Sequence, residues 1–507
     1  MKKINTILML LIFLIPQGSF AFGKHIHSLN IKPPPKPFTR SATLEKELAN
    51  SDASFLADPG AKLGHSITGI GDINGDNLED FAMGATYYQD SNDNYVGKVY
   101  IVFGKADGWS MDTNLLGADA SFIGEDNLDL MGYSLAGVDD INGDGYDDFI
   151  IGGWGWVEQE AKAYLILGKA DGWQNNVSLS NADASFIWEE DSNQTDWEYS
   201  NIDGIGDINN DSLDDFAIGA YGSDEGGADS GQTYIFFGKA TGWSLNTNLS
   251  TADASFIGEN GGDQSGASVA GVKDVNGDNI SDFIINAYGY SGYSGKTYLI
   301  FGKESGWQMD VNLSTADASF VGENSGDMSG FCLDGAGDIN NDNYNDFILA
   351  SDYHNSSTGK VYIILGKENS WSNNLSLSNS DASYIGENIK DMYECRANLS
   401  GIGDFNDDGF DDFIIGSAGY GGTDVNEIKS KGKTYLILGR NTGWTNDINL
   451  ANADLSYLGE NEIDNSGAVV AGVGDVNGDG HKDFIVGARE NEEAGADSGQ
   501  VYLILGE

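Results

Sequence analysis

The chain has 507 residues, 70 glycines and a formal net charge of −53, with 79 acidic residues against 26 Lys and Arg. No basic face is visible, which makes nucleic acid and anionic membrane surfaces poor partners. No window shows a sustained 3.6-residue apolar period, and the abundant glycines would destabilise helices. Both observations argue against a helical fold.

The N-terminal segment predicts export. Residues 1–21 combine Lys2 and Lys3, an apolar run from Ile7 to Pro16 and the ending Ser19-Phe20-Ala21, the order of a secretory signal peptide. A membrane anchor is the alternative, but this run is too short to cross a bilayer core of about 30 Å. We therefore expect a protein that does not span the membrane and is periplasmic, cell-surface or secreted.

Residues 22–50 contain the run Pro33 to Pro37, flanked by Lys and His residues, and predict a mobile Pro-rich leader. From residue 51 to residue 507 one pattern recurs seven times. Its most regular part is a nine-residue loop, which in the second copy reads Asp140-Ile-Asn142-Gly-Asp144-Gly-Tyr146-Asp-Asp148. Copies start 64 to 71 residues apart, which indicates one array of seven units.

The loops have the donor pattern of a calcium site. Carboxylate or amide groups stand at positions 1, 3, 5 and 9, the position 7 carbonyl supplies a further oxygen, and position 6 needs a residue that accepts positive φ. Zn²⁺ would require His or Cys ligands. The predicted ligands are Asp72, Asn74, Asp76, Leu78 and Asp80; Asp140, Asn142, Asp144, Tyr146 and Asp148; Asp207, Asn209, Asp211, Leu213 and Asp215; Asp274, Asn276, Asp278, Ile280 and Asp282; Asp338, Asn340, Asp342, Tyr344 and Asp346; Asp404, Asn406, Asp408, Phe410 and Asp412; Asp475, Asn477, Asp479, His481 and Asp483.

The pattern thus predicts up to seven structural Ca²⁺ ions. A metal-free turn rich in Asp and Asn is the alternative interpretation. Position 6 is Gly or Asn in six loops and Ser212 in the third. Serine adopts a left-handed backbone less readily, so we expect the third site to be the weakest.

Each repeat also contains four short apolar segments bounded by Gly, Asn or Asp, which predict strands. Seven four-stranded antiparallel units predict an all-β, seven-bladed β-propeller. The last repeat stops after its third strand, whereas the first begins with an extra strand, Ala53 to Leu56, which we expect to complete blade seven. Six tryptophans share one repeat position and are interpreted as packing residues; they are Trp109, Trp173, Trp243, Trp307, Trp371 and Trp444.

The segments Gly69-Ile-Gly71-Asp72-Ile-Asn-Gly-Asp, Asp80-Phe81-Ala-Met-Gly84-Ala85 and Gly97-Lys98-Val99-Tyr100 resemble the FG-GAP repeat of the integrin α propeller and its bacterial relatives. The resemblance covers residues 51 to 507. It implies a seven-bladed propeller, Ca²⁺ in the loops between strands 1 and 2, and an adhesive or ligand-binding role. Tyr199 and Arg396 replace a recurring glycine, so we expect blades three and six to enter their inner strands differently.

The face opposite the cation loops varies between repeats and is the predicted ligand face. Trp154, Trp156, Trp188 and Trp197 lie outside the repeated tryptophan position, and Tyr221 occupies a connection on the same face. Exposed aromatic groups near carboxylates suit a sugar or a protein partner. Local packing around a long loop is the alternative.

No catalytic motif is recognisable, because the histidines of the repeats lie in different blades without a nucleophile motif. We therefore predict no enzyme, but an exported, monomeric, calcium-binding adhesion or ligand-binding propeller with an extracellular protein or glycan partner. A propeller hydrolase or lyase acting on extracellular glycans, and a purely structural surface protein, remain alternatives. Cys332 and Cys395 occupy similar places in adjacent repeats, which leaves a disulfide and two free thiols both open.

Overall fold

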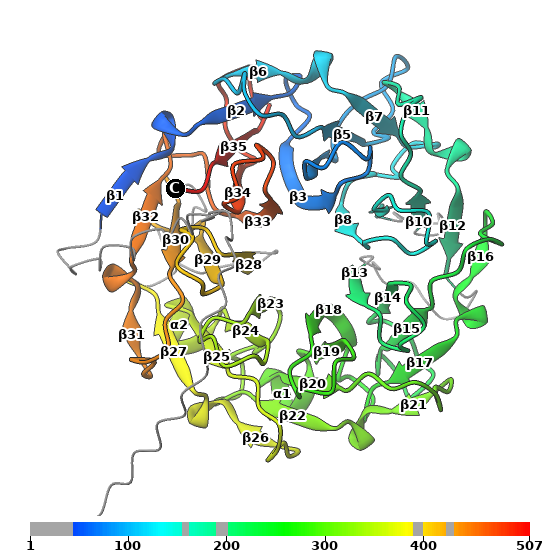
Figure 1. Ribbon diagram of the computed structural model, residues 1–507, viewed down its shortest axis with the longest axis vertical. Coiled ribbons are helices and arrows are strands. Elements are labelled where there is room, and N and C mark those ends of the chain that lie inside the picture. Colours follow the sequence, from blue (N-terminus) through cyan, green and yellow to red (C-terminus); the bar gives the residue numbers. More distant parts are fainter. Residues whose placement is uncertain (1–43, 155–161, 189–200, 389–398, 422–429) are drawn as a thin grey trace, which may run out of the picture. The chain divides into compact units, whose positions relative to one another are not determined.

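Seven five-stranded sheets surround a common axis in the computed structural model of the protein (Figure 1). The structure describes residues 44–154, 162–188, 201–388, 399–421 and 430–507. The predicted signal peptide and most of the predicted leader lie outside these residues. The predicted all-β, seven-bladed propeller is confirmed. No helix in the described parts of the chain is long and apolar enough to span a membrane.

The first three strands of each blade form an antiparallel meander that runs outward from the axis. In blade order, the inner strands are β3 (Leu63–Gly71), β8 (Ser134–Gly137), β13 (Asn201–Gly206), β18 (Ser265–Lys273), β23 (Leu333–Gly337), β28 (Leu399–Gly403) and β33 (Val469–Gly474). The second strands are β4 (Asp80–Ala85), β9 (Phe149–Gly152), β14 (Asp215–Ala220), β19 (Asp282–Ala287), β24 (Asp346–Ser351), β29 (Asp412–Ser417) and β34 (Asp483–Ala488). The third strands are β5 (Lys98–Val102), β10 (Lys162–Ile166), β15 (Gln232–Phe236), β20 (Lys296–Ile300), β25 (Lys360–Ile364), β30 (Lys433–Ile437) and β35 (Gln500–Ile504).

Two outer strands complete each blade, one more than predicted. The fourth strands are β7 (Ala120–Ile123), β12 (Ala184–Ile187), β17 (Ala254–Ile257), β22 (Ala318–Val321), β27 (Ala382–Ile385), β32 (Leu455–Leu458) and β2 (Ala53–Leu56). The fifth strands pair in parallel with them and are β11 (Val177–Ser178), β16 (Thr247–Asn248), β21 (Val311–Asn312), β26 (Leu375–Ser376), β31 (Ile448–Asn449), β1 (Leu44–Glu47) and β6 (Thr113–Asn114).

Each fifth strand except β1 belongs to the connection that follows the third strand of the next blade. It runs directly into a 3-10 turn and then into that next blade's fourth strand. These turns are η1 (Leu48–Asn50), η2 (Leu115–Gly117), η3 (Leu179–Asn181), η4 (Leu249–Thr251), η5 (Leu313–Thr315), η6 (Leu377–Asn379) and η7 (Leu450–Asn452). The outer edge of every blade is therefore tied to its neighbour.

The N-terminal segment closes the ring on two blades. As predicted, β2 pairs antiparallel with β35 and completes blade 7. In addition, β1 pairs in parallel with β32 of blade 6, and Leu48 of η1 is completely buried. The prediction of a mobile leader up to residue 50 is therefore wrong for residues 44–50, because they repeat the strand and turn that precede the fourth strand in the other blades.

Glycines at the axis let the inner strands approach one another. One glycine in each inner strand would, with a Cβ, come within 3.0 Å of the carbonyl oxygen of its counterpart in the preceding blade. These residues are Gly69, Gly137, Gly204, Gly271, Gly335, Gly401 and Gly472.

Replacing one axial glycine is expected to destabilise the whole ring. In Gly137→Ala the new Cβ would lie 2.7 Å from the carbonyl oxygen of Gly69, which is backbone and cannot rotate away. We expect a loss of about 1–3 kcal/mol in the free energy of unfolding, measured by urea denaturation. Gly117→Ala is the control, because no atom lies within 4 Å of its Cβ position. Equal stability of the two variants would contradict this description of the axis.

The predicted packing role of the six repeated tryptophans is confirmed. Trp173, for example, stacks on Phe149 with ring centroids 6.4 Å apart, and the Lys169 ammonium covers its other side at 4.7 Å. Trp109, Trp243, Trp307 and Trp444 likewise lie against a second-strand Phe and a cation. Trp371 lies edge-on to Phe320, with the Lys367 ammonium over its ring at 4.5 Å. Cys332 is disulfide-bonded, and Cys395, the only other cysteine in the sequence, lies outside the described residues.

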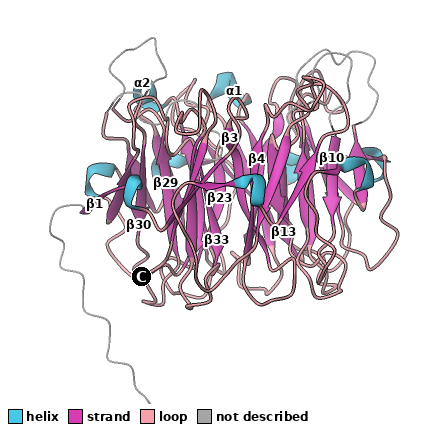
Figure 2. Ribbon diagram, turned by 90° about the horizontal axis from the view of Figure 1, so that it is seen from above, coloured by secondary structure: helices cyan, strands magenta, loops and turns pink. Residues whose placement is uncertain are grey.

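The connections divide into two faces (Figure 2). The short helices α1 (Tyr290–Tyr293) and α2 (His354–Ser357) lie between second and third strands and mark one face, which we call the upper face. The nine-residue loops and the connections from third to fourth strands lie on the opposite, lower face. They contact each other there, since the Lys169 amide donates to the carbonyl of Ile73 at 2.8 Å.

Candidate calcium loops and central pocket

The seven nine-residue loops share one backbone conformation. Position 6 has positive φ in every loop, at Asn77, Gly145, Ser212, Asn279, Asn343, Gly409 and Gly480. Position 4 also has positive φ in every loop, at Gly75, Gly143, Asn210, Gly277, Asn341, Asp407 and Gly478. Ser212 has a φ of 74°, so the third loop does impose a left-handed backbone on a serine. The need for positive φ at position 4 was not predicted, although Gly, Asn and Asp are the residues that adopt positive φ most readily.

The carboxylate at position 1 closes the turn. Asp140 accepts hydrogen bonds from the backbone amides of Gly143 (2.7 Å), Asp144 (3.1 Å) and Gly145 (2.8 Å). The other six position 1 residues accept from the amides of positions 5 and 6 in the same way. The loop conformation is thus built around the hydrogen bonds that the position 1 carboxyl group accepts.

The carboxylate at position 9 is completely buried in all seven loops. Asp412 accepts from the backbone amides of Gly439 (2.7 Å) and Phe405 (3.0 Å). Burial and, to a lesser extent, the nearby carboxylates of Asp408 and Asp404 raise the pKa of Asp412 to about 8, although the hydrogen bonds from the Gly439 and Phe405 amides oppose this rise. Burial likewise raises the pKa of its counterparts, to about 8 in five loops and to about 7 at Asp483. Each loop therefore holds a buried acid whose ionised form needs a compensating positive charge.

The remaining donors lie beside these carboxylates. The Asn74 amide is 3.3 Å from Asp80 at position 9, whereas the Asn406 and Asn477 amides point to position 5, at 3.1 Å and 3.0 Å. In the described parts of the chain, no three Asp, Glu, His or Cys side chains converge closely enough to hold a metal ion. The donor types fit a hard cation such as Ca²⁺, but the side chains at positions 1, 5 and 9 would have to move closer together to bind one ion.

Adjacent loops are linked around the ring. Asp147, at position 8 of the second loop, accepts from the amide of Asp72 in the first loop at 2.7 Å. The amide of Asp147 donates to the carbonyl of Asp72 at 3.3 Å. A corresponding backbone link joins five other pairs of neighbouring loops. The conformation of one loop is therefore coupled to that of the next.

The predicted ligand residues do not form one group. Trp188 is only 6 % exposed and belongs to the core of blades 2 and 3, so its assignment to an exposed ligand site is wrong. It occupies the position of Gly124 in the preceding repeat and turns into the core. Trp154 is half-buried and packs edge-on against Tyr133, with centroids 4.7 Å apart. Trp156 and Trp197 lie outside the described residues.

Tyr221 lines a pocket of about 490 Å³ at the axis of the ring. Residues of all seven inner strands contribute to this central pocket, and aromatic side chains of Tyr133, Tyr288 and Phe331 also line it. Asp203 of blade 3 and Asp334 of blade 5 add two carboxyl groups to its lining. Neither residue is among those predicted from the sequence. A signal was present, because the other five repeats carry Ala, Ser or Thr at this position, four residues before the loop.

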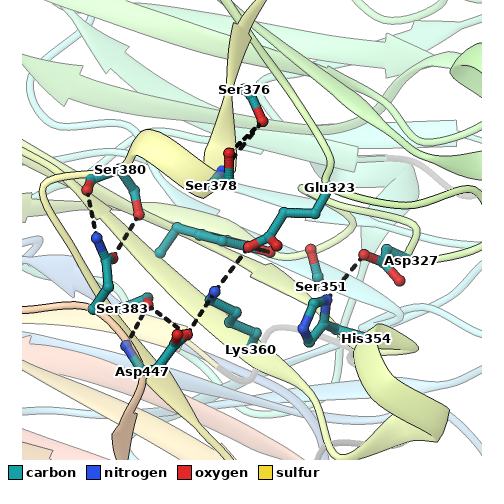
Figure 3. A network of polar contacts seen from close by, with 12 residues as sticks. Glu323, Asp327, Ser351, His354, Lys360, Ser376, Ser378, Ser380, Ser383 and Asp447 are labelled. Atoms are coloured by element: carbon teal, nitrogen blue, oxygen red, sulfur yellow. Dashed lines mark hydrogen bonds and ion pairs between the residues drawn. The ribbon is translucent and has the colours of Figure 1, made fainter.

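A polar network joins adjacent blades next to α2 (Figure 3). The Lys360 ammonium contacts Glu323 at 2.8 Å and Asp447 at 2.7 Å, and His354 Nδ1 lies 2.9 Å from Asp327. Lys433 makes the corresponding contact with Glu387, and the Asn491 amide takes the place of His354 opposite Asp464 at 3.0 Å. Because Asn491 makes the equivalent contact in blade 7, we interpret the His354–Asp327 contact as a structural link between two loops.

Comparison with known proteins agrees with this architecture. The FG-GAP repeat family matches residues 64–102, 265–300 and 466–504, which contain the first three strands of blades 1, 4 and 7. Integrin alpha pat-2 of Caenorhabditis elegans is 33 % identical over 113 residues, covering 22 % of this chain and 8 % of the relative. Integrin alpha-V of Gallus gallus is 28 % identical over 259 residues, covering 49 % and 22 %. Integrin alpha-PS2 of Drosophila melanogaster is 29 % identical over 205 residues, covering 39 % and 13 %. The chain thus spans less than a quarter of each relative's length.

Proposed function

Because the chain is a member of the FG-GAP repeat family of integrin α-type β-propellers, we propose that it is a calcium-stabilised adhesion or ligand-binding module. It is exported by its N-terminal signal and acts outside the cell on a protein or glycan partner. Binding, not catalysis, is its activity, in keeping with relatives that carry the names of integrin α subunits.

The difference between the two faces carries this proposal. The lower face repeats one loop seven times, with the same left-handed positions and the same buried acid. The upper face carries irregular connections, α1 and α2, and exposed aromatic groups such as Tyr87 and Tyr293. Recognition of a partner needs a surface that differs from blade to blade, whereas a surface that repeats in every blade suits a scaffold.

Calcium would act as part of that scaffold. The carboxylates at positions 1, 5 and 9, the position 3 amide and the position 7 carbonyl of each loop would hold one ion. The ion would supply the positive charge that the buried position 9 carboxylate lacks when ionised. It would thereby fix the turn between the inner and second strands of each blade.

Parallel binding and turnover assays test the proposed function. Purified protein in calcium buffer is screened on glycan arrays and by pull-down of extracellular proteins, and assayed for polysaccharide cleavage. We expect binding without turnover, and a Kd at least about tenfold weaker for Tyr221→Ala, at unchanged melting temperature. Leu116→Ala is the control, because this residue is 71 % exposed in η2 at the outer edge of the ring. Turnover, or binding that Tyr221→Ala leaves unchanged, would contradict the proposal.

A further inference from the structure

One position of the inner strand distinguishes the blades within the central pocket. It lies four residues before each nine-residue loop and is occupied by Thr68, Ala136, Asp203, Ala270, Asp334, Ser400 and Ala471. Only blades 3 and 5 place a carboxyl group there. All of these residues except Ala136 line the pocket, so the two carboxyl groups face a space bounded mainly by small side chains at this level.

The fold does not require these two charges. Asp203 accepts from the Gly271 amide at 3.0 Å, and Asp334 accepts from the Gly401 amide at 3.2 Å. In blade 6, the Ser400 hydroxyl accepts from the equivalent amide, that of Gly472, at 3.1 Å. A neutral hydroxyl therefore serves the same interblade hydrogen bond. Alanine in three other blades shows that the ring closes without any acceptor at this position.

Holding two carboxyl groups here is energetically unfavourable in the free protein. Burial raises the pKa of Asp203 well above its ordinary value, and the nearby Asp334 raises it further. Burial also raises the pKa of Asp334 to about 6, although hydrogen bonds from the Gly401 amide and the Ser400 hydroxyl, and to a smaller extent Lys273, counteract this rise. Asp139 adds a further negative charge near Asp203. Two half-buried carboxyl groups that line one pocket repel each other when ionised, so a bound cation would be favoured.

The pocket has the size and walls for an organic cation. Its volume of about 490 Å³ lies in the range of small-molecule sites. Tyr133, Tyr221, Tyr288 and Phe331 line it, and Tyr288 meets Phe331 edge-on with centroids 5.2 Å apart. Aromatic rings attract organic cations. The net charge of −53 further concentrates cations around the protein.

We propose that the central pocket binds a small aliphatic diamine, with its ammonium groups on Asp203 and Asp334 and its methylene chain among the small side chains at their level. The inference rests on the proposed function as a ligand-binding module and assigns a ligand class to the pocket at its axis. Ammonium N–H groups donate charge-assisted hydrogen bonds to the two carboxylates. A neutral or fully methylated analogue lacks either the charge or the donors.

Calorimetric titration of the full chain with butane-1,4-diamine tests this inference. Saturating calcium and constant ionic strength keep the nine-residue loops and the general acidic surface out of the measurement. We expect one diamine per chain, and binding at least about tenfold weaker for butane-1,4-diol and for the fully N-methylated diammonium compound. Equal binding of all three compounds, or no diamine binding at millimolar concentration, would overturn the inference.

Serine variants separate the pocket from the general field of the protein. Asp203→Ser and Asp334→Ser copy Ser400 and retain an acceptor for the neighbouring glycine amide. We expect each variant to melt no lower than the parent protein and to bind diamine at least about tenfold more weakly. Asp107→Ser is the control, since it removes one charge from an exposed lower-face connection. Equal weakening in Asp107→Ser would overturn the inference. Loss of diamine binding alone would leave binding of a glycan or protein partner intact, so the proposed function is tested separately.

Discussion

Removal of calcium is expected to lower the melting temperature of the protein by about 10 °C or more. A ligand that binds only the folded state at 100 times its Kd adds about 2.7 kcal/mol per site, and up to seven sites contribute. About 1 kcal/mol shifts the melting temperature of a domain of 150–250 residues by about 2–4 °C, and that of a larger domain by less. The measurement is thermal unfolding followed by circular dichroism, in calcium and in excess chelator.

Magnesium at equal ionic strength, in the same chelator, is the control for this shift. Mg²⁺ demands a tight octahedral shell and dehydrates reluctantly, so we expect it to restore little of the lost stability. A melting curve that chelator leaves unchanged would contradict the structural role of calcium.

The calcium effect is also expected to grow as pH rises from about 4 to about 8. Burial raises the pKa of Asp412 to about 8, above the ordinary aspartate pKa of 3.8. In the chelated protein, a pKa that is higher in the folded state than in the unfolded state stabilises the fold. This stabilisation is complete below the pKa of the unfolded state and is lost as pH rises through about 8. Bound calcium would keep the carboxylate ionised and remove this loss. A calcium-dependent shift that is equal at pH 5 and pH 8 would contradict this coupling.

Leu48→Ala is expected to destabilise the protein by about 2–5 kcal/mol, the second large effect. Leu48 is completely buried between blades 6 and 7, in the core that contains Tyr457 and Tyr502. Its truncation opens a cavity where the two ends of the propeller meet, so closure of the ring is weakened. Urea denaturation measures the loss.

Leu44→Ala is the matched control for ring closure. Leu44 lies in β1, the strand that leads into η1, but is 57 % exposed. We expect its replacement to change stability by no more than about 0.5 kcal/mol. If Leu48→Ala were as stable as Leu44→Ala, closure by residues 44–50 would be refuted.

The number and order of the blades could be predicted because the nine-residue loop recurs seven times between recognisable strands. The fifth strands could not, because two residues such as Thr113 and Asn114 carry no periodicity. The first strand, which begins at Leu44, could have been predicted from the sequence. Leu48-Ala-Asn-Ser-Asp-Ala53 matches Leu450-Ala-Asn-Ala-Asp-Leu455, but the neighbouring prolines favoured an extended leader.

The central pocket shows a different limit. Asp203 and Asp334 stand at one repeat position, yet only the closed ring brings blades 3 and 5 to the same cavity. Trp188 shows the reverse, because a large aromatic residue in place of a glycine was taken for an exposed anchor, whereas the structure buries it. The sequence contained the signal for these residues, but only the arrangement of the blades shows which side each one faces.

Native mass spectrometry of the calcium-dialysed protein tests the central claim most directly. The proposed loops predict several bound Ca²⁺ ions per chain, up to seven. Asp412→Asn, at position 9 of the sixth loop, is predicted to bind one ion fewer than the parent protein. A parent protein whose mass contains no calcium at millimolar calcium, or an Asp412→Asn variant with an unchanged count, would contradict the claim.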